Sequence, residues 1–520
     1  MELDFTIKNY RCFADTKPAQ FSIRPRGFTA FVGTNNSGKT TLLKLFYELR
    51  SVFQLMSGGG FKQALNGEDL FQLPSTGISD YQQIFSKFND RHITLSIQIR
   101  VPESQEKKTG STQFPKEIVF TIYRKREASY SAKIRTVNGF IQNKIGDTPL
   151  YDTQAIQNLS DLLSKTLYIG PFRNVVNLGT EGDSYDIKVG KSLIKMWTDM
   201  KTGRNAMESE TAYRVTEDIK RIFRYERFEV NSSSEDDTLQ IFINDKSYKL
   251  PEVGAGLAHL IVGLANAAKR QPSVILIDEP ELNLHPSLQI DFLTTLASYA
   301  KYGVIFTTHN IGLARAVADK IYSVRQSENG ENEVRPLECT RYLTEFLGEL
   351  SYSGYKEMGF EIVLLVEGVT EVKTIHQFLR LYKKDHIVLL IPMGGAQLIN
   401  EKAELELQEL TRIPAKFFAL IDSEKGSAEE PLHNSRAAFR EICQKLRITC
   451  RVLERRALEN YLTDAAIKAE KGDKYRALEY YESLEKVNPS WAKTENWCIA
   501  RRMKLQDIKD TDLGLFLASI

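Results

Sequence analysis

A glycine-rich loop between a short apolar strand and a helix restricts the fold of this chain more than any other segment. The loop reads Gly33-Thr34-Asn35-Asn36-Ser37-Gly38-Lys39-Thr40, between a strand expected at 28–33 and a helix expected at about 39–50. Glycine permits the tight turn, and a helix start directs backbone N–H groups at one point. G-x-x-x-x-G-K-[ST] in this context predicts a phosphate-binding P-loop in an α/β domain.

This loop predicts how a nucleotide would be held. Lys39 would reach the β- and γ-phosphates, and Thr40 would ligate Mg²⁺. Backbone N–H groups around the loop would surround the phosphates. The expected nucleotide-binding residues of the loop are Asn35, Asn36, Ser37, Gly38, Lys39, Thr40 and Thr41.

A second motif completes the predicted nucleotide site about 239 positions after Lys39. A buried strand expected at 274–278 ends in Asp278 and Glu279. Asp278 would hold Mg²⁺ through water, and Glu279 would polarise the attacking water. His309 follows the next strand, expected at 303–308, at the same sheet edge, so it is interpreted as a γ-phosphate sensor. The long separation predicts insertions into the nucleotide-binding core at about 50–165 and 175–250, the latter a candidate dimerisation region.

A second strand–helix alternation begins after residue 360. Strands are expected at 362–366, 387–391 and 417–421, with helices at about 371–383 and 399–411 and mostly helical structure from about 455. Glu367 follows the first strand, and Glu371 lies four residues later on the same helical face. Asp422 and Glu424 end another strand, where i/i+2 spacing predicts side chains on one side. Hard carboxylate oxygens at adjacent strand ends predict a Mg²⁺ or Mn²⁺ site.

Composition sets wider limits. A length of 520 residues predicts two or three domains. The 69 basic and 67 acidic residues give a net charge of +2, so overall charge does not indicate a nucleic-acid partner. Five cysteines without a C-x-x-C pair give no reason to expect a disulfide framework or zinc site. No signal peptide or membrane span is expected, so the chain is predicted to be soluble and cytoplasmic.

The first part of the chain, about residues 1–325, resembles the ABC-type ATPases, particularly the RecF and SMC branch. Further matching segments are Ile7–Phe13, Tyr168–Arg173 and Glu281–Pro286. The resemblance implies ATP and Mg²⁺ as ligands and a homodimer or higher homo-oligomer formed through the ATPase domain. Where the family has a Ser-Gly-Gly-like loop, this chain has Val253-Gly254-Ala255-Gly256-Leu257. Gly254 and Gly256 would still present N–H groups to ATP, and the missing serine favours ATP binding as a dimer clamp over rapid turnover.

The second part resembles the toprim fold of topoisomerases, DnaG-type primases and OLD (overcoming lysogenization defect) family nucleases. Val366–Glu371 is similar to the E-G-x-x-[DE] motif, and Leu420–Glu424 to the D-x-D strand, with Glu424 in place of the second Asp. Leu458–Leu462 resembles a further acidic motif of the OLD family, which makes Glu459 a candidate metal ligand. Trp491–Asn496 resembles the segment with that family's essential lysine, which assigns transition-state stabilisation to Lys493.

This order of domains is that of the OLD family: an ABC-type ATPase at 1–345 and a toprim nuclease domain with a helical C-terminus at 346–520. The resemblance implies a nucleotide-regulated, Mg²⁺- or Mn²⁺-dependent DNA endonuclease or nickase. It also implies a role in antiphage defence, as in Gabija and some retrons, with a helicase-like protein or a reverse transcriptase with its RNA and DNA as a partner. One alternative is a RecF/SMC-like DNA-binding ATPase with an inactive toprim domain. The other is a topoisomerase, which would need a nucleophilic tyrosine such as Tyr461.

Overall fold

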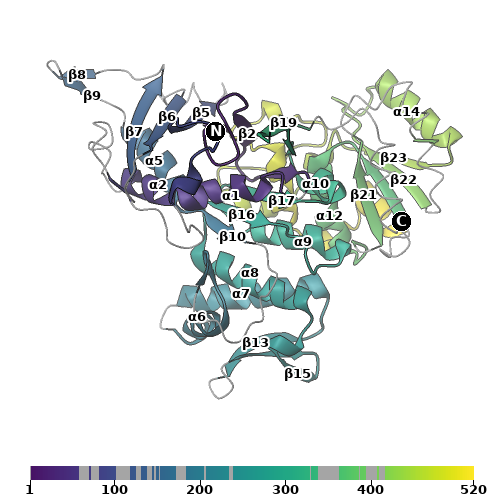
Figure 1. Cartoon of the computed structure of the whole chain (residues 1–520). Helices are drawn as coiled ribbons and strands as arrows, with labels where there is room; N and C mark the ends of the chain where they lie inside the picture. Colours follow the sequence, from purple (N-terminus) through teal and green to yellow (C-terminus); the bar gives the residue numbers. More distant parts are fainter. Residues whose placement is uncertain are drawn as a thin grey trace. The chain divides into compact units, whose positions relative to one another are not determined.

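The computed structural model of this chain forms two compact units (Figure 1). The first consists of Met1–His309 and Lys320–Leu337, and the second of Asn310–Asp319 and Glu338–Ile520. Within these limits the structure describes residues 2–34, 36–57, 70–71, 81–100, 117–124, 130–137, 143–145, 148–150, 153–170, 183–203, 206–233, 238–327, 330–337, 362–385, 387–393, 404, 407–408 and 416–520.

A largely parallel sheet forms the centre of the first unit. Its strands are, in spatial order, β10 (Leu167–Ile169), β16 (Val274–Asp278), β17 (Gly303–Thr308), β3 (Gly27–Val32), β18 (Lys320–Gln326) and β19 (Asn332–Pro336). Only the β18–β19 pair is antiparallel among these described strands. Every residue of β16, β17 and β3 is buried, because strands of a parallel sheet are covered on both faces. The carboxyl ends of β3, β16 and β17 therefore meet at one edge.

An antiparallel sheet accompanies it, with the strand order β2 (Ala19–Ile23), β1 (Glu2–Lys8), β5 (Ile93–Arg100), β6 (Glu117–Tyr123), β7 (Tyr130–Val137) and β4 (Leu70–Phe71). Burial alternates along β5, as it does in a strand with one face against the core. One hydrophobic cluster contains residues of both sheets, of α1 (Lys39–Glu48) and of α2 (Arg50–Ser57). Helix α5 (Thr153–Ser164) packs on α2. Short strands β8 (Asn143–Ile145) and β9 (Thr148–Leu150) form a separate hairpin.

A helical region of the first unit lies between residues 183 and 300. Its helices are α6 (Gly190–Thr202), α7 (Ala206–Phe223), α8 (Ala255–Arg270) and α9 (Pro286–Ala297). Helix α7 packs against α6, α8 and α9 (Figure 1). Three antiparallel strands follow α7: β13 (Phe228–Ser233), β14 (Thr238–Ile243) and β15 (Lys246–Lys249). Asn244, with a φ of 54°, turns the chain back between β14 and β15.

The second unit contains a parallel sheet in the order β21 (Val388–Pro392), β20 (Ile362–Val366), β22 (Lys416–Ile421) and β23 (Thr449–Val452). The two faces of β20 belong to different cores. Ile362, Leu364 and Val366 pack with α12 (Val369–Leu381) and the C-terminal helices, whereas Val363 and Leu365 pack with α14 (Asn434–Lys445). The helix expected at 399–411 lies largely outside the described residues.

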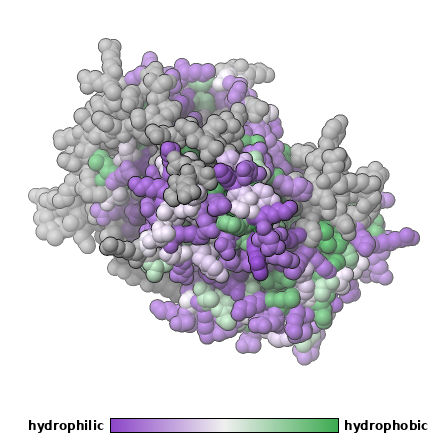
Figure 2. All heavy atoms as spheres, turned by 90° about the horizontal axis from the view of Figure 1, so that it is seen from below, coloured by the Kyte–Doolittle hydropathy of each residue, from purple (hydrophilic) through white to green (hydrophobic). Residues whose placement is uncertain are grey.

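Short helices follow β23, so the expected helical C-terminus is correct in type but is more broken than predicted. They are η5 (Leu458–Tyr461), α15 (Asp464–Lys471), η6 (Leu484–Lys486), η7 (Lys493–Glu495), α16 (Asn496–Ala500), α17 (Leu505–Ile508) and α18 (Asp512–Ser519). Among the described residues, no helix combines the length and apolar character needed to span a bilayer. The face drawn in Figure 2 is mostly hydrophilic where residues are described.

Candidate functional site

The P-loop connects β3 to α1 and has the close-packed backbone that its glycines permit. Gly38, with a φ of 94°, caps α1, and Gly33 has a φ of 158°. A Cβ at Gly33 would lie 2.2 Å from the carbonyl oxygen of Val324, so only glycine fits. Ser37 Oγ is buried without a hydrogen-bond partner among the described residues. The helix start and this unpaired hydroxyl fit a bound phosphate chain; Asn35 lies outside the described residues.

Lys39 is buried at this site. Its ammonium donates to the carbonyl oxygens of Gly33 and Thr34, both at 2.9 Å, and lies 3.2 Å from His309 Nε2. Burial lowers the pKa of Lys39, and the carboxylates of Glu279 and Asp278 oppose that change. An ammonium held at the loop with its pKa below the usual value suits a strong counter-charge such as phosphate.

Two predicted magnesium-binding side chains are in contact. Thr40 Oγ1 donates to Asp278 Oδ2 at 2.8 Å, and Thr307 Oγ1 donates to the other oxygen of Asp278. Burial raises the pKa of Asp278, whereas these hydroxyl donors lower it. A hydroxyl and a carboxylate in this arrangement fit the oxygen ligands of Mg²⁺. Thr41, the next residue, hydrogen-bonds instead with the Cys12 thiol.

Glu279 and His309 meet beside the P-loop. Glu279 has a φ of 52°, unusual for a non-glycine residue, and its N–H donates to Thr307 O at 3.1 Å. Its Oε1 lies 3.2 Å from His309 Nε2. The structure therefore brings Lys39, Glu279 and His309 together at one sheet edge, as their strand-end positions indicated.

Glu281 is a site residue for which sequence reasoning assigned no role. Its Oε1 accepts hydrogen bonds from Thr308 Oγ1 at 2.6 Å and from the His309 N–H at 3.0 Å. These bonds fix the turn that presents the His309 ring to Glu279. The signals in the sequence were a third acidic residue shortly after β16 and the place of Glu281 at the start of the matching segment Glu281–Pro286.

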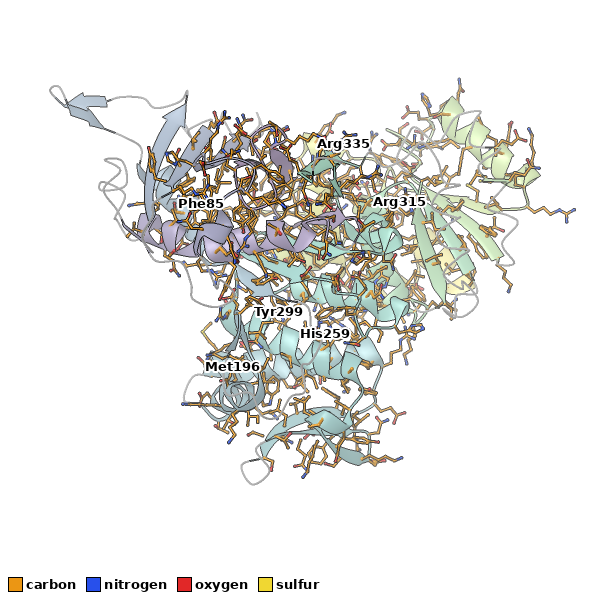
Figure 3. All side chains as sticks on the ribbon, viewed as in Figure 1. Phe85, Met196, His259, Tyr299, Arg315 and Arg335 are labelled. Atoms are coloured by element: carbon orange, nitrogen blue, oxygen red, sulfur yellow. The ribbon has the colours of Figure 1, made fainter. Side chains whose placement is uncertain are left out.

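Gly254 and Gly256, expected at a partner's γ-phosphate, differ in their surroundings. Gly254 precedes the first turn of α8, and no described atom lies within 4 Å of a Cβ placed on it. A Cβ on Gly256 would lie 2.5 Å from Asn283 O, so this glycine allows α8 to pack against the turn after β16. Farther along α8 lies His259, which Figure 3 labels. Its Nδ1 is 3.2 Å from Leu282 O, and its ring packs edge-to-face against the ring of Phe292.

In the second unit, Glu367 and Asp422 are joined at the ends of β20 and β22. The Asp422 N–H donates to Glu367 Oε1 at 2.9 Å, and Leu458 N donates to Asp422 Oδ1 at 3.1 Å. Burial raises the pKa of Asp422, and the nearby charges of Glu367, Glu371 and Glu459 raise it further. Burial also raises the pKa of Glu367. Several carboxylates that raise one another's pKa in a buried space favour a cation among them.

Glu459 and Lys493, expected from the resemblance alone, also reach this cluster. Lys493 Nζ lies 3.0 Å from Glu459 Oε1. Glu459 is 4% exposed, and its second oxygen, Oε2, is buried without a hydrogen-bond partner among the described residues. Burial opposes the charge of Lys493, but Glu459 and Asp422 together raise its pKa above the ordinary value. The unpaired carboxylate oxygen fits a metal ligand in this cluster.

Glu371 and Glu424 occupy different surroundings. Glu371 is in the first turn of α12, accepts a hydrogen bond from Thr370 Oγ1 at 3.0 Å and faces the charge of Asp422. Strand β22 ends at Ile421, so the alternation expected to align Asp422 with Glu424 does not apply. Glu424 instead has a φ of 56°, and its Oε2 lies 2.9 Å from Arg456. The negative charge of Glu424 still helps to raise the pKa of Glu367.

Arg436 is the main residue that the sequence did not reveal. It lies in the first turn of α14 and is buried. Its guanidinium donates to both carboxylate oxygens of Glu367 at 3.2 Å and to Asp422 O at 2.7 Å. An arginine that binds a carboxylate through both oxygens holds it in one orientation. The charge of Arg436 also opposes the rise that burial causes in the pKa of Glu367.

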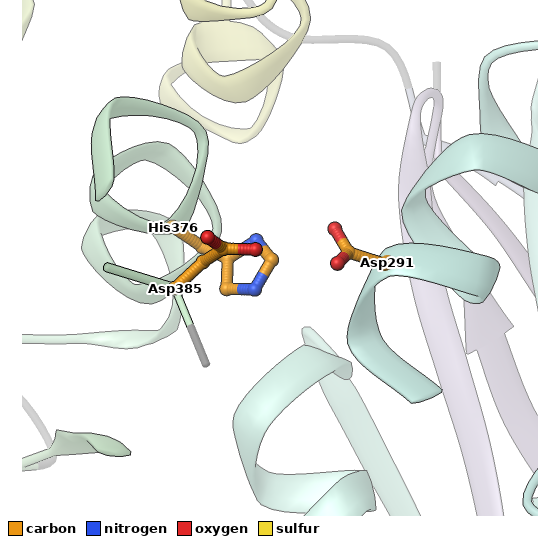
Figure 4. A group of neighbouring side chains, drawn as sticks. All are labelled: Asp291, His376 and Asp385. Carbon is orange, nitrogen blue, oxygen red and sulfur yellow. The ribbon is translucent and has the colours of Figure 1, made fainter. Parts of the chain in front are cut away.

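His376 and Asp385 of the second unit lie outside this carboxylate cluster. His376 is on α12 and Asp385 is in the turn that follows, with a ring nitrogen and a carboxylate oxygen within 4.8 Å (Figure 4). Asp291, also drawn there, belongs to α9 of the first unit. Two side chains of one unit do not define a metal centre, so we assign no such role to this pair.

The P-loop, Asp278 and His309 at one edge of a parallel sheet define an ATP-binding P-loop ATPase of the ABC type. Residues 28–315, just over half of the chain, match one protein family. The chain belongs to this family, which is described as "AAA domain, putative AbiEii toxin, Type IV TA system".

Curated relatives match a smaller region. The chain is 32% identical over 84 residues to the glutamate transport ATP-binding protein GluA of Corynebacterium efficiens, which covers 16% of this chain and 35% of that protein. It is 30% identical over 97 residues to the glutamine transport ATP-binding protein GlnQ of Bacillus subtilis, a match that covers 18% of this chain and 40% of that protein. The chain thus spans less than half the length of these relatives.

Solved structures of SMC head domains are also similar. The SMC head domain from Thermotoga maritima covers 65% of this chain and 100% of its own, with 18% identity and a TM-score of 0.34. An SMC head bound to the C-winged helix domain of ScpA matches 64% of this chain and 96% of its own, with 14% identity and a TM-score of 0.38. Similarity at this level carries no argument about function.

Proposed function

We propose that this ATPase is a nucleotide-regulated, divalent-metal-dependent DNA endonuclease or nickase of the OLD family, with a toprim-type second unit. One observation supports the proposal above all others. The second unit buries Asp422 and Glu459 beside the partly buried Glu367, and leaves Glu459 Oε2 without a hydrogen-bond partner among the described residues. Buried acidic groups of this kind are costly unless a cation joins them.

The metal ligands of this proposal are Glu367, Glu371, Asp422 and Glu459, with Glu424 near the edge of the cluster. When bound, divalent ions would activate water and stabilise the departing 3′ oxygen of a DNA phosphodiester. The protein's own groups hold the ligands in place: Arg436 orients Glu367, and the N–H of Leu458 orients Asp422. Lys493, whose side chain is 47% exposed, can turn from Glu459 toward a phosphate oxygen.

In the first unit the proposed roles follow the contacts around the P-loop. Lys39 and the start of α1 bind phosphate, Thr40 and Asp278 hold Mg²⁺, and Glu279 orients water. His309, in contact with both Lys39 and Glu279, senses the γ-phosphate. Gly254 at the open start of α8 is free to meet ATP held by a second copy of the chain, so ATP would clamp a dimer. A role in antiphage defence, with a helicase-like or reverse-transcriptase partner, belongs to the same proposal.

A plasmid-nicking assay tests the proposal. The full chain is incubated with supercoiled DNA and Mg²⁺ or Mn²⁺, with ATP, ADP or no nucleotide. We expect nicking that falls by roughly 100-fold or more in Glu371→Gln and Lys493→Ala. Glu485→Gln, at an exposed position of η6, is the matched control and should keep full activity. Absence of metal-dependent nicking under all nucleotide conditions, or equal nicking by the variants, would reject the proposal.

A second candidate is a DNA-binding ATPase whose second unit is inactive. It is favoured by the cations that the protein itself places on the acidic groups: Arg436 on Glu367, Arg456 on Glu424 and Lys493 on Glu459. If these ion pairs persist, the cluster has no need of a metal. Titration of Mn²⁺ by electron paramagnetic resonance separates the candidates, because an inactive unit would show no binding that depends on Glu371.

A further inference from the structure

We infer that the ring of Tyr480 is a stacking surface for an unpaired nucleobase of the DNA strand held at the carboxylate cluster. This inference rests on the proposed function and specifies its substrate as DNA with an unpaired segment beside the cleavage site. The Tyr480 side chain is 57% exposed, which makes it one of few large hydrophobic side chains of the described surface with such exposure.

The Tyr480 ring is held in place from one side. The guanidinium carbon of Arg455 lies 4.4 Å from the centroid of the Tyr480 ring and 4.6 Å from that of Tyr461. Tyr461 is buried and fixed by its hydroxyl, which donates to Asp512 at 2.6 Å. Arg455 is fixed in turn, because its NH1 donates to Asn460 O at 2.6 Å. A ring held in this way loses little conformational entropy when a base stacks on it.

The opposite face of the ring suits a base. The neighbouring Tyr481 ring lies 6.3 Å away at an angle of 52°, so it does not stack on Tyr480. A cation on one face of an aromatic ring draws π-electron density toward itself. The other face then stacks more favourably on an electron-rich base, and every base has such a face.

The position of the ring ties it to the candidate active site. Tyr480 O accepts a hydrogen bond from the Arg456 N–H at 2.9 Å, and the Arg456 side chain binds Glu424. The adjacent Glu479 O accepts from Asn460 Nδ2 at 2.6 Å, next to the candidate ligand Glu459. The loop with Tyr480 is thus bonded to the segment that presents Glu459 and Leu458 to the cluster. A DNA strand at the cluster would pass this ring.

The local charge is compatible with a DNA strand. Arg455 provides a cation on this side of the cluster, whereas Arg456 is paired with Glu424 at 2.9 Å and Arg476 with Glu482 at 2.7 Å. A phosphate that flanks a stacked base would find Arg455 within the same segment. The combination of an aromatic surface and cations is the usual composition of a single-strand binding surface.

Binding measured without divalent metal tests the inference, because no cleavage then occurs. The full chain is titrated with fluorescent oligo(dT) and with a duplex of equal length, in EDTA. We expect Tyr480→Leu to weaken oligo(dT) binding roughly 5- to 150-fold, Tyr480→Phe to retain it and duplex binding to change little. Tyr213→Leu, an exposed tyrosine of α7 in the other unit, is the control and should bind as the unaltered chain does.

Photocrosslinking gives a readout that a purely structural role would not produce. An oligonucleotide with 5-iodouracil should crosslink to Tyr480, located by mass spectrometry. The inference is overturned if oligo(dT) binding is unchanged in Tyr480→Leu, if phenylalanine fails to rescue, if duplex binding falls equally or if crosslinks map elsewhere. A chain that never cleaves DNA but shows this Tyr480-dependent binding would lose the proposed nuclease function and keep this inference.

Discussion

Lys373 and Asp319 form a buried ion pair within the second unit, with Lys373 Nζ 2.8 Å from Asp319 Oδ1 and their side chains 0% and 6% exposed. Lys373 lies on α12, which begins just after Glu367. Asp319 lies just beyond α10 (Ile311–Val317), the helix that follows His309. The pair and the packing of α10 on α12 explain why Asn310–Asp319 belongs to the second unit although the chain on both sides belongs to the first.

Breaking this ion pair should destabilise the second unit. Lys373→Met leaves the Asp319 carboxylate buried without its ammonium partner, and we expect a cost of about 3–5 kcal/mol. Lys373→Met combined with Asp319→Asn should recover part of that loss, because a neutral amide costs less to bury. Urea unfolding, followed by hydrogen exchange of α12 amides, measures the effect. Lys486→Met, at an exposed position, is the control, and an equal effect there would contradict the assignment.

The two glycines before and within α8 should respond differently to alanine. Gly256→Ala places a methyl group 2.5 Å from Asn283 O, so we expect a loss of about 1–3 kcal/mol. Gly254 has a φ of −57° and space for a methyl group, so Gly254→Ala should change stability by only about 0.5 kcal/mol. Thermal unfolding of the two variants is compared with that of the unaltered chain. Similar losses in both would show that α8 does not pack on Asn283 as described.

The sequence predicts a feature of this fold well when neighbouring residues specify it, and poorly when residues distant in sequence do. The P-loop, Asp278 and His309 were predicted because a strand followed by a loop specifies each position. The end of β22 was not predicted correctly. Glu424 lies beyond the strand, where its N–H donates to the carbonyl oxygen of Arg456, a residue distant in sequence. Arg436 was missed for the same reason, since 69 positions separate it from Glu367.

His259 predicts a pH dependence of stability in the first unit. Burial lowers the pKa of this histidine from 6.5 to about 4, and its bond to Leu282 O only partly opposes this. Because the folded pKa lies below the unfolded one, the unfolded chain binds the additional proton. The stabilisation from neutral His259 is therefore fully present above pH 6.5 and is lost as the pH falls toward 4. The full loss amounts to about 3 kcal/mol.

The measurement is a comparison of urea midpoints at pH 7.5 and pH 4.5 for the unaltered chain and His259→Gln. The variant should be less stable at pH 7.5, because it loses the contact with Phe292, but it should lose less stability on acidification. Carboxylates also titrate in this range, but they do so in both proteins, so their effects on stability cancel in the comparison. Equal acid sensitivity of the two proteins would show that His259 is not buried as a neutral ring.

Removal of one carboxylate tests whether the cluster of the second unit binds metal, independently of any cleavage. Mn²⁺ that binds only the folded chain should raise its melting temperature, by an amount set by concentration and affinity. Glu459→Gln keeps the shape of the side chain but removes the charge beside Asp422, so we expect the Mn²⁺-dependent increase to be lost. The same change frees Lys493 from its ion pair at 3.0 Å. Arg502 and Glu470 form an ion pair of equal length elsewhere in the unit, so Glu470→Gln is the matched control and should keep the full increase. An increase in melting temperature that survives Glu459→Gln would mean that Mn²⁺ binds at another site.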